Sequence, residues 1–180
     1  MVYLFLAEGF EEIEALTPVD VLRRGGVQVV TVGVGGATVK GSHGIRVGAD
    51  ISDSELVSFE GAEAVVLPGG MPGTKNLDAC GKVHEAIGYC IENGVVLGAI
   101  CAAPSILGRA GVLKGKRAVC YPGFEGEIKG CVPAENKVCR DGNIITAAGM
   151  GVSLDFALEL LGAVKGAEAA EKVRTSLQCR

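Results

Sequence analysis

The residue best placed for covalent chemistry is Cys101, within the stretch VVLGAICAAPSIL. It follows an apolar run of strand length and precedes a helical pattern, with Ala99 and Ala103 two positions away on either side. Small residues at these positions suit the tight strand-to-helix turn of a nucleophile elbow. The N-terminus of a helix also favours a thiolate over a thiol. The alternative is an inert, buried cysteine, because the motif GxCxG itself is absent.

A second candidate is the loop LPGGMPG, which follows the apolar run at residues 64–67. Gly69 and Gly70 allow the backbone to point N–H groups toward a ligand or a developing oxyanion. A plain tight turn between a strand and a helix is the alternative. The loop is not a Walker motif, because no Lys-Ser/Thr pair follows at the required spacing.

A third candidate is the acidic stretch AEGFEEIEA, in which Glu11, Glu12 and Glu14 fall in the first turn of a helical pattern. Exposed acids are usual there, because the positive end of a helix favours them, and we expect Glu11 and Glu12 to point outward. Glu14 lies beside Ile13 and can face the sheet. A carboxyl group partly buried against a thiol would share a proton with it, which raises the pKa of the acid and suits it for proton transfer. Periodicity alone does not favour Glu14 over its neighbours.

Apolar runs of strand length alternate with amphipathic helical patterns along the chain. We predict strands at 2–7, 27–34, 64–67, 95–100, 117–120, 137–140 and 144–147, a hairpin at 35–49, and helices at 11–24, 77–93, 102–110, 151–162 and 166–175. Continuous apolar strands separated by helices indicate a mostly parallel sheet covered on both faces. With no linker or repeat in the sequence, we expect one three-layer α/β domain over residues 1–180.

The first predicted helix places Ile13, Leu16, Val19 and Leu22 near one apolar face, and Pro18 is a local irregularity that can bend it. In open α/β sheets, ligands bind at the carboxyl ends of the strands. Four loops are expected there, after residues 7, 67, 100 and 120. This rule brings the thiol, the glycines and the acids to one edge of the sheet.

Composition excludes several classes of function. The net charge of −4 with no basic run excludes a nucleic-acid groove, and no apolar stretch approaches the roughly 20 residues that span a bilayer. The N-terminus lacks a basic leader and a long apolar core, so we expect no secretory signal and a cytoplasmic location. Seven cysteines, an odd number, then indicate free thiols. There is no CxxC pair, and His43 and His84 are remote from the cysteines in sequence, so neither a zinc site nor a cofactor is expected.

The whole chain resembles the ThiJ/PfpI superfamily, in its DJ-one branch. The motifs that carry the resemblance occur in order: GFEEIEALTPVDVLRRGG, VVLPGGMPGTKNL, GAICAAPSILGRAGVLKGK, YPGFE, ENKVCRDGNIITAAGMG and SLDFALELL. The resemblance implies a flavodoxin-like fold and a homodimer. It makes Cys101 the nucleophile, Glu14 its hydrogen-bonded acid, and the N–H groups of Gly70 and Ala102 an oxyanion pocket.

The resemblance also implies an activity. Relatives in this branch are described as glutathione-independent glyoxalases and deglycases in carbonyl and oxidative stress, so the expected substrate is a small aldehyde or a glycated protein. The alternative is a redox sensor or chaperone in which Cys101 is oxidised to sulfinate. Peptidase activity is not expected, because Ala102 stands where the protease branch has His.

One departure concerns histidine. Glyoxalase-active members often carry His where this chain has Tyr121, and neither His43 nor His84 aligns with that position. A tyrosine is a poor base at neutral pH because its pKa is about 10, so Tyr121 is expected only as a pocket residue. His43 falls in the predicted hairpin. It is expected to be a solvated loop residue, or else to reach a neighbouring site across a dimer contact.

Overall fold

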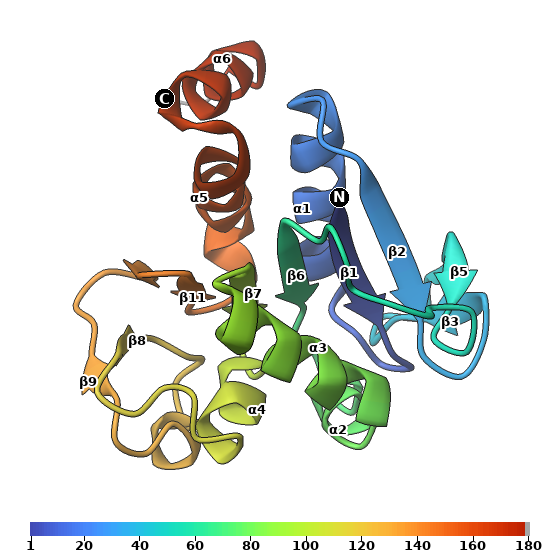
Figure 1. The fold of residues 1–180 in the computed structure, drawn as a ribbon, viewed down its shortest axis with the longest axis horizontal. Coiled ribbons are helices and arrows are strands. Elements are labelled where there is room, and N and C mark those ends of the chain that lie inside the picture. Colours follow the sequence, from blue (N-terminus) through green and yellow to red (C-terminus); the bar gives the residue numbers. More distant parts are fainter. Residues whose placement is uncertain (179–180) are drawn as a thin grey trace.

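The structure is a computed structural model that describes residues 1–178. Its centre is a seven-stranded sheet in the order β10-β11-β7-β6-β1-β2-β5 (Figure 1). Neighbouring strands are parallel throughout, except for the antiparallel pair β10–β11 at one edge. Helices cover both faces of the sheet. The predicted mostly parallel, flavodoxin-like α/β fold is therefore confirmed.

The elements follow one another in an alternating order. The strands are β1 (Val2–Leu6), β2 (Val29–Gly33), β3 (Thr38–Lys40), β4 (Arg46–Gly48), β5 (Ile51–Ser52), β6 (Ala64–Leu67), β7 (Val96–Ile100), β8 (Arg117–Ala118), β9 (Val132–Pro133), β10 (Val138–Asp141) and β11 (Ile144–Ala147). The helices are α1 (Glu12–Arg24), α2 (Gly73–Asp78), α3 (Gly81–Asn93), α4 (Pro104–Arg109), α5 (Ser153–Lys165) and α6 (Ala167–Ser176), with short 3-10 turns η1 (Glu125–Glu127) and η2 (Met150–Val152).

Two apolar cores lie on opposite faces of the sheet. On one face α1 and α5 pack against each other and over the strands, with α6 beyond them, and Phe156, Leu160 and Leu22 are fully covered there. On the other face α3 and α4 cover the strands around Phe5 and Leu97 (Figure 1). Alternate side chains of the central strands point to opposite faces, so β1, with all five residues buried, contributes to both cores.

Several predicted elements differ from the structure. The segment predicted as one helix over 77–93 belongs to two helices, α2 and α3. The chain leaves the helix at Ala79 and Cys80, between them. The strand predicted over 117–120 ends at Ala118 and pairs with β9 in a separate two-stranded sheet, outside the main one. The hairpin predicted over 35–49 is confirmed as the antiparallel pair β3–β4, whereas the short edge strand β5 was missed.

The predicted apolar face of α1 was wrong in its first turns. The side chains of Ile13 and Leu16 are 53% and 37% exposed, whereas Glu12 and Glu14 are buried. The helix buries Ala15, Val19 and Leu22 against β1 and α5, and this orientation turns the first-turn acids toward the loops at the sheet edge. Helix α1 runs without interruption through its proline. Its orientation, not its hydrophobicity, therefore brings carboxyl groups toward the predicted site.

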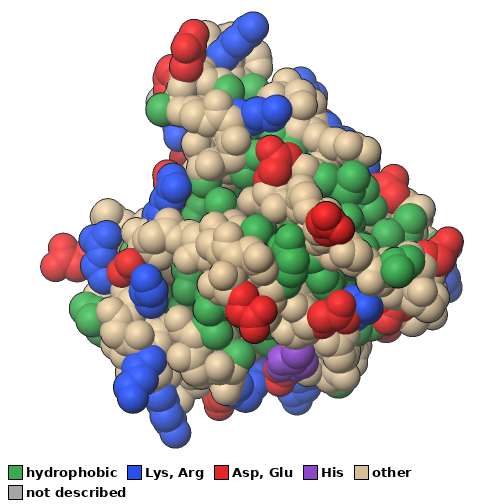
Figure 2. Space-filling model, in the orientation of Figure 1, with side chains coloured by type: hydrophobic (Ala, Val, Ile, Leu, Met, Phe, Trp, Pro, Cys, Tyr) green, Lys and Arg blue, Asp and Glu red, His purple; other side chains and the backbone are tan. Residues whose placement is uncertain are grey.

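Acidic and basic side chains are interspersed on the face of the molecule shown in Figure 2, and neither sign forms a continuous band there. This distribution agrees with the absence of a basic run in the sequence. Within residues 1–178, none of the helices combines the length and the apolar character that a transmembrane helix needs.

Candidate active site

Cys101 occupies a sharp turn between β7 and α4. Its φ angle is +64°, in the left-handed region, which costs a residue with a Cβ about 1–2 kcal/mol. Two backbone hydrogen bonds hold this conformation: the Cys101 N–H donates to the carbonyl of Ala147, and the Tyr121 N–H donates to the carbonyl of Cys101, both at 2.8 Å. The side chain is 8% exposed. The turn has the backbone of a nucleophile elbow, in which the surrounding structure maintains a strained residue.

Glu14 is fully buried beside this turn. Its Oε2 accepts a hydrogen bond from the Gly69 N–H at 2.9 Å. Its Oε1 is buried too and has no hydrogen-bond partner among residues 1–178. Burial raises the pKa of Glu14 to about 7, although hydrogen bonds from Cys101 and Gly69 act in the opposite direction. A carboxyl group in this setting holds a proton near neutral pH and is suited to transfer it.

Gly69 is the point at which Glu14 and Cys101 meet. A Cβ added to Gly69 would lie 2.6 Å from Glu14 Oε2, 2.7 Å from Cys101 Cβ and 3.0 Å from the carbonyl oxygen of Ile100. These separations are shorter than van der Waals contact with carbon. The absence of a side chain at Gly69 therefore allows the acid and the thiol to approach each other across the loop.

Opposing influences act on the Cys101 thiol. Burial raises its pKa to about 12, and the neighbouring negative charge of Glu14 adds to this effect. The N–H groups of Ala102 and Gly70 lower the pKa. When Glu14 holds its proton, the repulsion disappears and the two N–H groups remain to stabilise a thiolate. The pair therefore shares one negative charge, and its titration belongs to both groups.

Cys90 shows the effect of burial alone on the pKa of a thiol. Its thiol is fully buried in a helix, and burial raises the pKa to about 12 with no opposing N–H group. Such a cysteine is an inert core residue. The N–H groups at Gly70 and Ala102 are what set Cys101 apart from it.

The loop after β6 is held by the first turn of the chain's acidic stretch. Gly70 has a φ of +89°, and a Cβ there would overlap the backbone of Gly9, Phe10 and Glu11. The Glu11 N–H donates to the Gly69 carbonyl at 3.0 Å. The structure thus brings together the predicted site residues of three separate loops at the carboxyl edge of the sheet.

Tyr121 lies beside this site. Its N–H donates a hydrogen bond to the Cys101 carbonyl. Tyr121 is 42% exposed, and its ring contacts Gly149. The ring lines a hollow of about 250 Å³ together with Met150 and Val152. The backbone of Met150 also lowers the pKa of Glu14. The role of Tyr121 as a pocket residue of the Cys101 site stays a prediction.

The loop after β11 was missed at the sequence level. Gly149 and Met150 follow a strand of the main sheet, in the motif AAGMG. The carboxyl-end rule that selected the other four loops applies to this strand as well. The sequence therefore contained the pattern that could have identified this loop.

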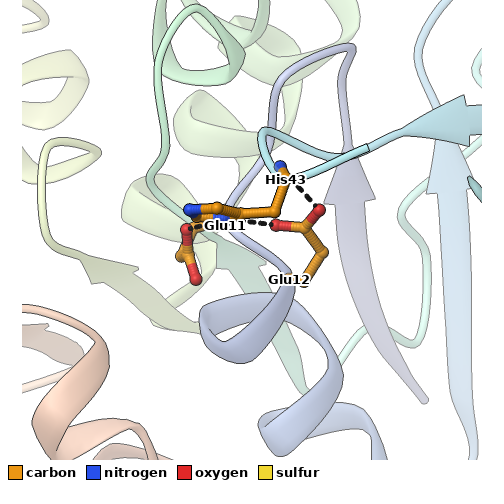
Figure 3. Close-up of side chains that lie close together, drawn as sticks. All are labelled: Glu11, Glu12 and His43. Carbon is orange, nitrogen blue, oxygen red and sulfur yellow. Dashed lines mark hydrogen bonds and ion pairs between the residues drawn. The ribbon is translucent and has the colours of Figure 1, made fainter. Parts of the chain in front are cut away.

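The prediction that Glu11 and Glu12 point outward was wrong. Each is only 5% exposed, because the β3–β4 loop folds over them and places Ser42 against their carboxylates. His43, from the same loop, lies against both carboxylates as well (Figure 3). The side chain of His43 is 69% exposed and lies 3.0 Å from Glu12 Oε2 through its Nδ1. His43 is thus partnered within its own chain.

The fold and this site define a class: flavodoxin-like α/β proteins with a cysteine on a nucleophile elbow. Residues 1–163 match the model of the DJ-1/PfpI family. The chain is 36% identical over 177 residues to Protein DJ-1alpha of Drosophila melanogaster. The matched region covers 97% of this chain and 82% of that protein. The chain belongs to the DJ-1/PfpI family, as the sequence motifs predicted.

Other relatives agree with this assignment. A Caenorhabditis elegans protein named glutathione-independent glyoxalase DJR-1.2 is 31% identical, over 89% of this chain and 86% of that protein. The solved structure of oxidised DJ-1 from Toxoplasma gondii has a TM-score of 0.93 at 32% identity, covering 98% of this chain and 97% of that one. The chain spans 40% of Protein DJ-1 homolog B of Arabidopsis thaliana.

Proposed function

We propose that the protein is a cysteine-dependent, glutathione-independent glyoxalase or deglycase that acts on small α-oxoaldehydes or on their adducts with proteins. The observation that carries this proposal is the position of Cys101, on a left-handed elbow between two N–H donors and a buried carboxyl group. The relative named as a glutathione-independent glyoxalase supports it.

In the proposed reaction, the Cys101 thiolate attacks the aldehyde carbon and forms a hemithioacetal. The N–H groups of Gly70 and Ala102 stabilise the oxyanion that develops. Glu14 gives its proton to the oxyanion, and its carboxylate then removes the proton from the former aldehyde carbon and returns it to the adjacent carbonyl carbon through an enediol. The hydroxyl proton passes to the adjacent carbonyl oxygen, which converts the hemithioacetal to a thioester of a 2-hydroxy acid. Water then hydrolyses the thioester and restores the thiol. The sum is one aldehyde and one water giving one 2-hydroxy acid, with no external oxidant.

The test is consumption of methylglyoxal without glutathione, with the D- and L-lactate formed measured separately. Cys101→Ser is expected to abolish turnover, because a hydroxyl has no accessible anion at neutral pH. Cys139→Ser, at a buried cysteine on the edge strand β10, is the matched control and is expected to retain it. Equal rates for wild type and Cys101→Ser contradict the proposal.

A second candidate is a redox sensor or chaperone in which Cys101 becomes a sulfinate. The two N–H groups that would hold an oxyanion also suit a sulfinate oxygen, and the oxidised form of the Toxoplasma gondii relative supports this candidate. Mild peroxide followed by peptide mass spectrometry tests it. Cys131 is more exposed than Cys101, so exposure alone predicts that Cys131 reacts first. Oxidation of Cys101 ahead of Cys131 supports the sensor; the reverse order counts against it. Cys179 lies outside the described residues.

We also propose that the protein forms a homodimer, as the family resemblance implies. The partly exposed apolar side chains of Ile13 and Leu16 are surface that a second copy could cover. Analytical ultracentrifugation tests this, and a monomer mass at micromolar concentration contradicts it. The single domain over residues 1–180 and the cytoplasmic location stay predictions.

A further inference from the structure

The most unusual group of side chains outside the Cys101 site is a cluster of two carboxylates, an imidazole and a hydroxyl. Glu11 and Glu12 come from the start of α1, and His43 comes from the loop between β3 and β4 (Figure 3). Ser42, from the same loop, lies beside all three. Both carboxylates are 5% exposed. Neither forms an ion pair with a lysine or an arginine among residues 1–178; their ion pairs are with His43. Two buried negative charges therefore face a single imidazole.

The spacing of the four polar atoms is the spacing of metal ligands. Ser42 Oγ lies 3.2 Å from Glu11 Oε2, 3.2 Å from Glu12 Oε2 and 3.1 Å from His43 Nδ1. His43 Nδ1 lies 3.3 Å from Glu11 Oε2 and 3.0 Å from Glu12 Oε2. The ligand atoms of Glu11, Glu12 and His43 all lie within 4.8 Å of one another. Atoms at such separations can close around one ion at roughly the 2.0–2.2 Å length of a Zn–N or Zn–O bond with small side-chain adjustments.

There are too few protons for each of these contacts to be a separate hydrogen bond. Five short separations join the four atoms, but Ser42 Oγ carries one proton and His43 Nδ1 carries at most one. At least three of the contacts therefore lack a proton of their own, so that either a proton is shared between two acceptors or lone pairs face each other. A cation between these atoms removes this shortage, because every lone pair then has an acceptor.

The surroundings orient the cluster. The N–H groups of His43 and Ile45 donate to the other oxygen of Glu12, Oε1, at 2.8 and 3.4 Å, which turns Oε2 toward the cluster. Gly41 lies directly over this carboxyl group, where a side chain would overlap it. Such outer contacts are what orient carboxylate ligands in metal sites. The largely exposed His43 ring leaves a path for an ion to enter.

We propose that Glu11, Glu12 and His43, with the Ser42 hydroxyl at a fourth corner, bind a divalent transition-metal ion of the zinc class. Mg²⁺ and Ca²⁺ fit less well, because they prefer six or more oxygen ligands, whereas imidazole nitrogen suits Zn²⁺ and Co²⁺. The sequence-based expectation of no zinc site considered cysteine spacings. Here the ligand atoms are oxygen and nitrogen, and the residues that carry them, Glu12 and His43, are 31 positions apart in sequence. The site does not include Cys101 and is independent of the proposed glyoxalase activity.

Titration of the full chain with Co²⁺ alone, in a non-coordinating buffer and with Zn²⁺ as competitor, tests this proposal. Thiolate ligands give cobalt an intense near-ultraviolet charge-transfer band, which carboxylate and imidazole ligands do not give, so the cysteines are distinguished from this cluster. We expect one equivalent bound per chain, with visible d–d bands, without the thiolate band, and displaced by Zn²⁺.

Two variants and a control complete the test. His43→Asn, at an exposed loop position, and Glu12→Gln are each expected to weaken Zn²⁺ binding more than about 100-fold, since even outer contacts are worth about 10–100-fold. His84→Asn, at the other histidine, which lies beside Asp78, is expected to leave binding unchanged. The proposal is overturned by a thiolate band at the first equivalent, by no binding, or by unchanged affinity in His43→Asn.

Discussion

Gly69→Ala tests the central claim about the site, that the acid and the thiol meet across a loop with no room for a side chain. The new Cβ would lie 2.6 Å from Glu14 Oε2 and 2.7 Å from Cys101 Cβ, both buried. The φ angle of Gly69 is not in the left-handed region, so the loss of stability comes from these contacts and not from backbone strain. Neither neighbour can move into solvent to relieve the overlap.

The magnitude follows from two contributions. Overpacking of a filled interior costs about 1–3 kcal/mol. Displacement of Glu14 also stretches the 2.9 Å hydrogen bond from the Gly69 N–H, which is worth roughly 1–3 kcal/mol when a partner is charged or left buried and unpaired. Together they predict a loss of about 2–6 kcal/mol in the free energy of unfolding. The same displacement is expected to change the alkylation rate of Cys101.

Gly88→Ala is the matched control. Gly88 lies within α3, and a Cβ there meets no atom within 4 Å. Alanine in a helix interior is favoured over glycine, so this variant is expected to gain about 0.5–1 kcal/mol. Urea unfolding followed by far-ultraviolet circular dichroism measures both variants, since the chain has no Trp to serve as a fluorescent probe. A Gly69→Ala protein as stable as wild type refutes the reasoning.

Two further predictions concern pH. Because ionised Glu14 raises the pKa of the Cys101 thiol, the alkylation rate of wild type is expected to show a step near pH 7 and a further rise above it. Glu14→Gln is expected to show a single step, and superimposable profiles contradict the coupling. Burial alone would raise the pKa of Asp50, but hydrogen bonds from Thr31 and Arg23 lower it below its ordinary 3.8. A lowered pKa gives stability that is present above about pH 4 and lost on acidification, so Asp50→Asn is expected to lose less stability in acid than wild type. Parallel curves of unfolding free energy against pH, measured in urea, contradict this prediction.

Local pattern was sufficient for much of the fold. Continuous apolar runs such as 64–67 and 144–147 predicted buried parallel strands, because both faces of such a sheet are covered. The strand-to-helix transition at Cys101 and its small neighbours predicted the elbow that its φ of +64° confirms. The motifs predicted the family, which the match over residues 1–163 confirms. These features depend on neighbours in sequence.

The orientation of the first turn of α1 is different, because it depends on packing. Nothing in the spacing of Glu11, Glu12 and Glu14 distinguishes an exposed acid from a buried one. Packing of α1 against β1 and α5 turned Ile13 outward and Glu14 inward, and the β3–β4 loop then covered the other two acids. Burial, which raises the pKa of Glu14, exists only once these distant segments meet.

By itself, the sequence determined a mostly parallel α/β sheet, the family, and a cysteine at the end of a buried strand. Local spacing did not distinguish the carboxyl group that accompanies that cysteine, although the family resemblance pointed to Glu14. The tertiary structure buried Glu14 beside the cysteine and placed His43 on Glu12. The reason is physical. Strand and turn formation follow from local sterics and hydrophobic pattern, whereas proton sharing and ligand geometry require side chains from separate loops to lie within about 3 Å of one another.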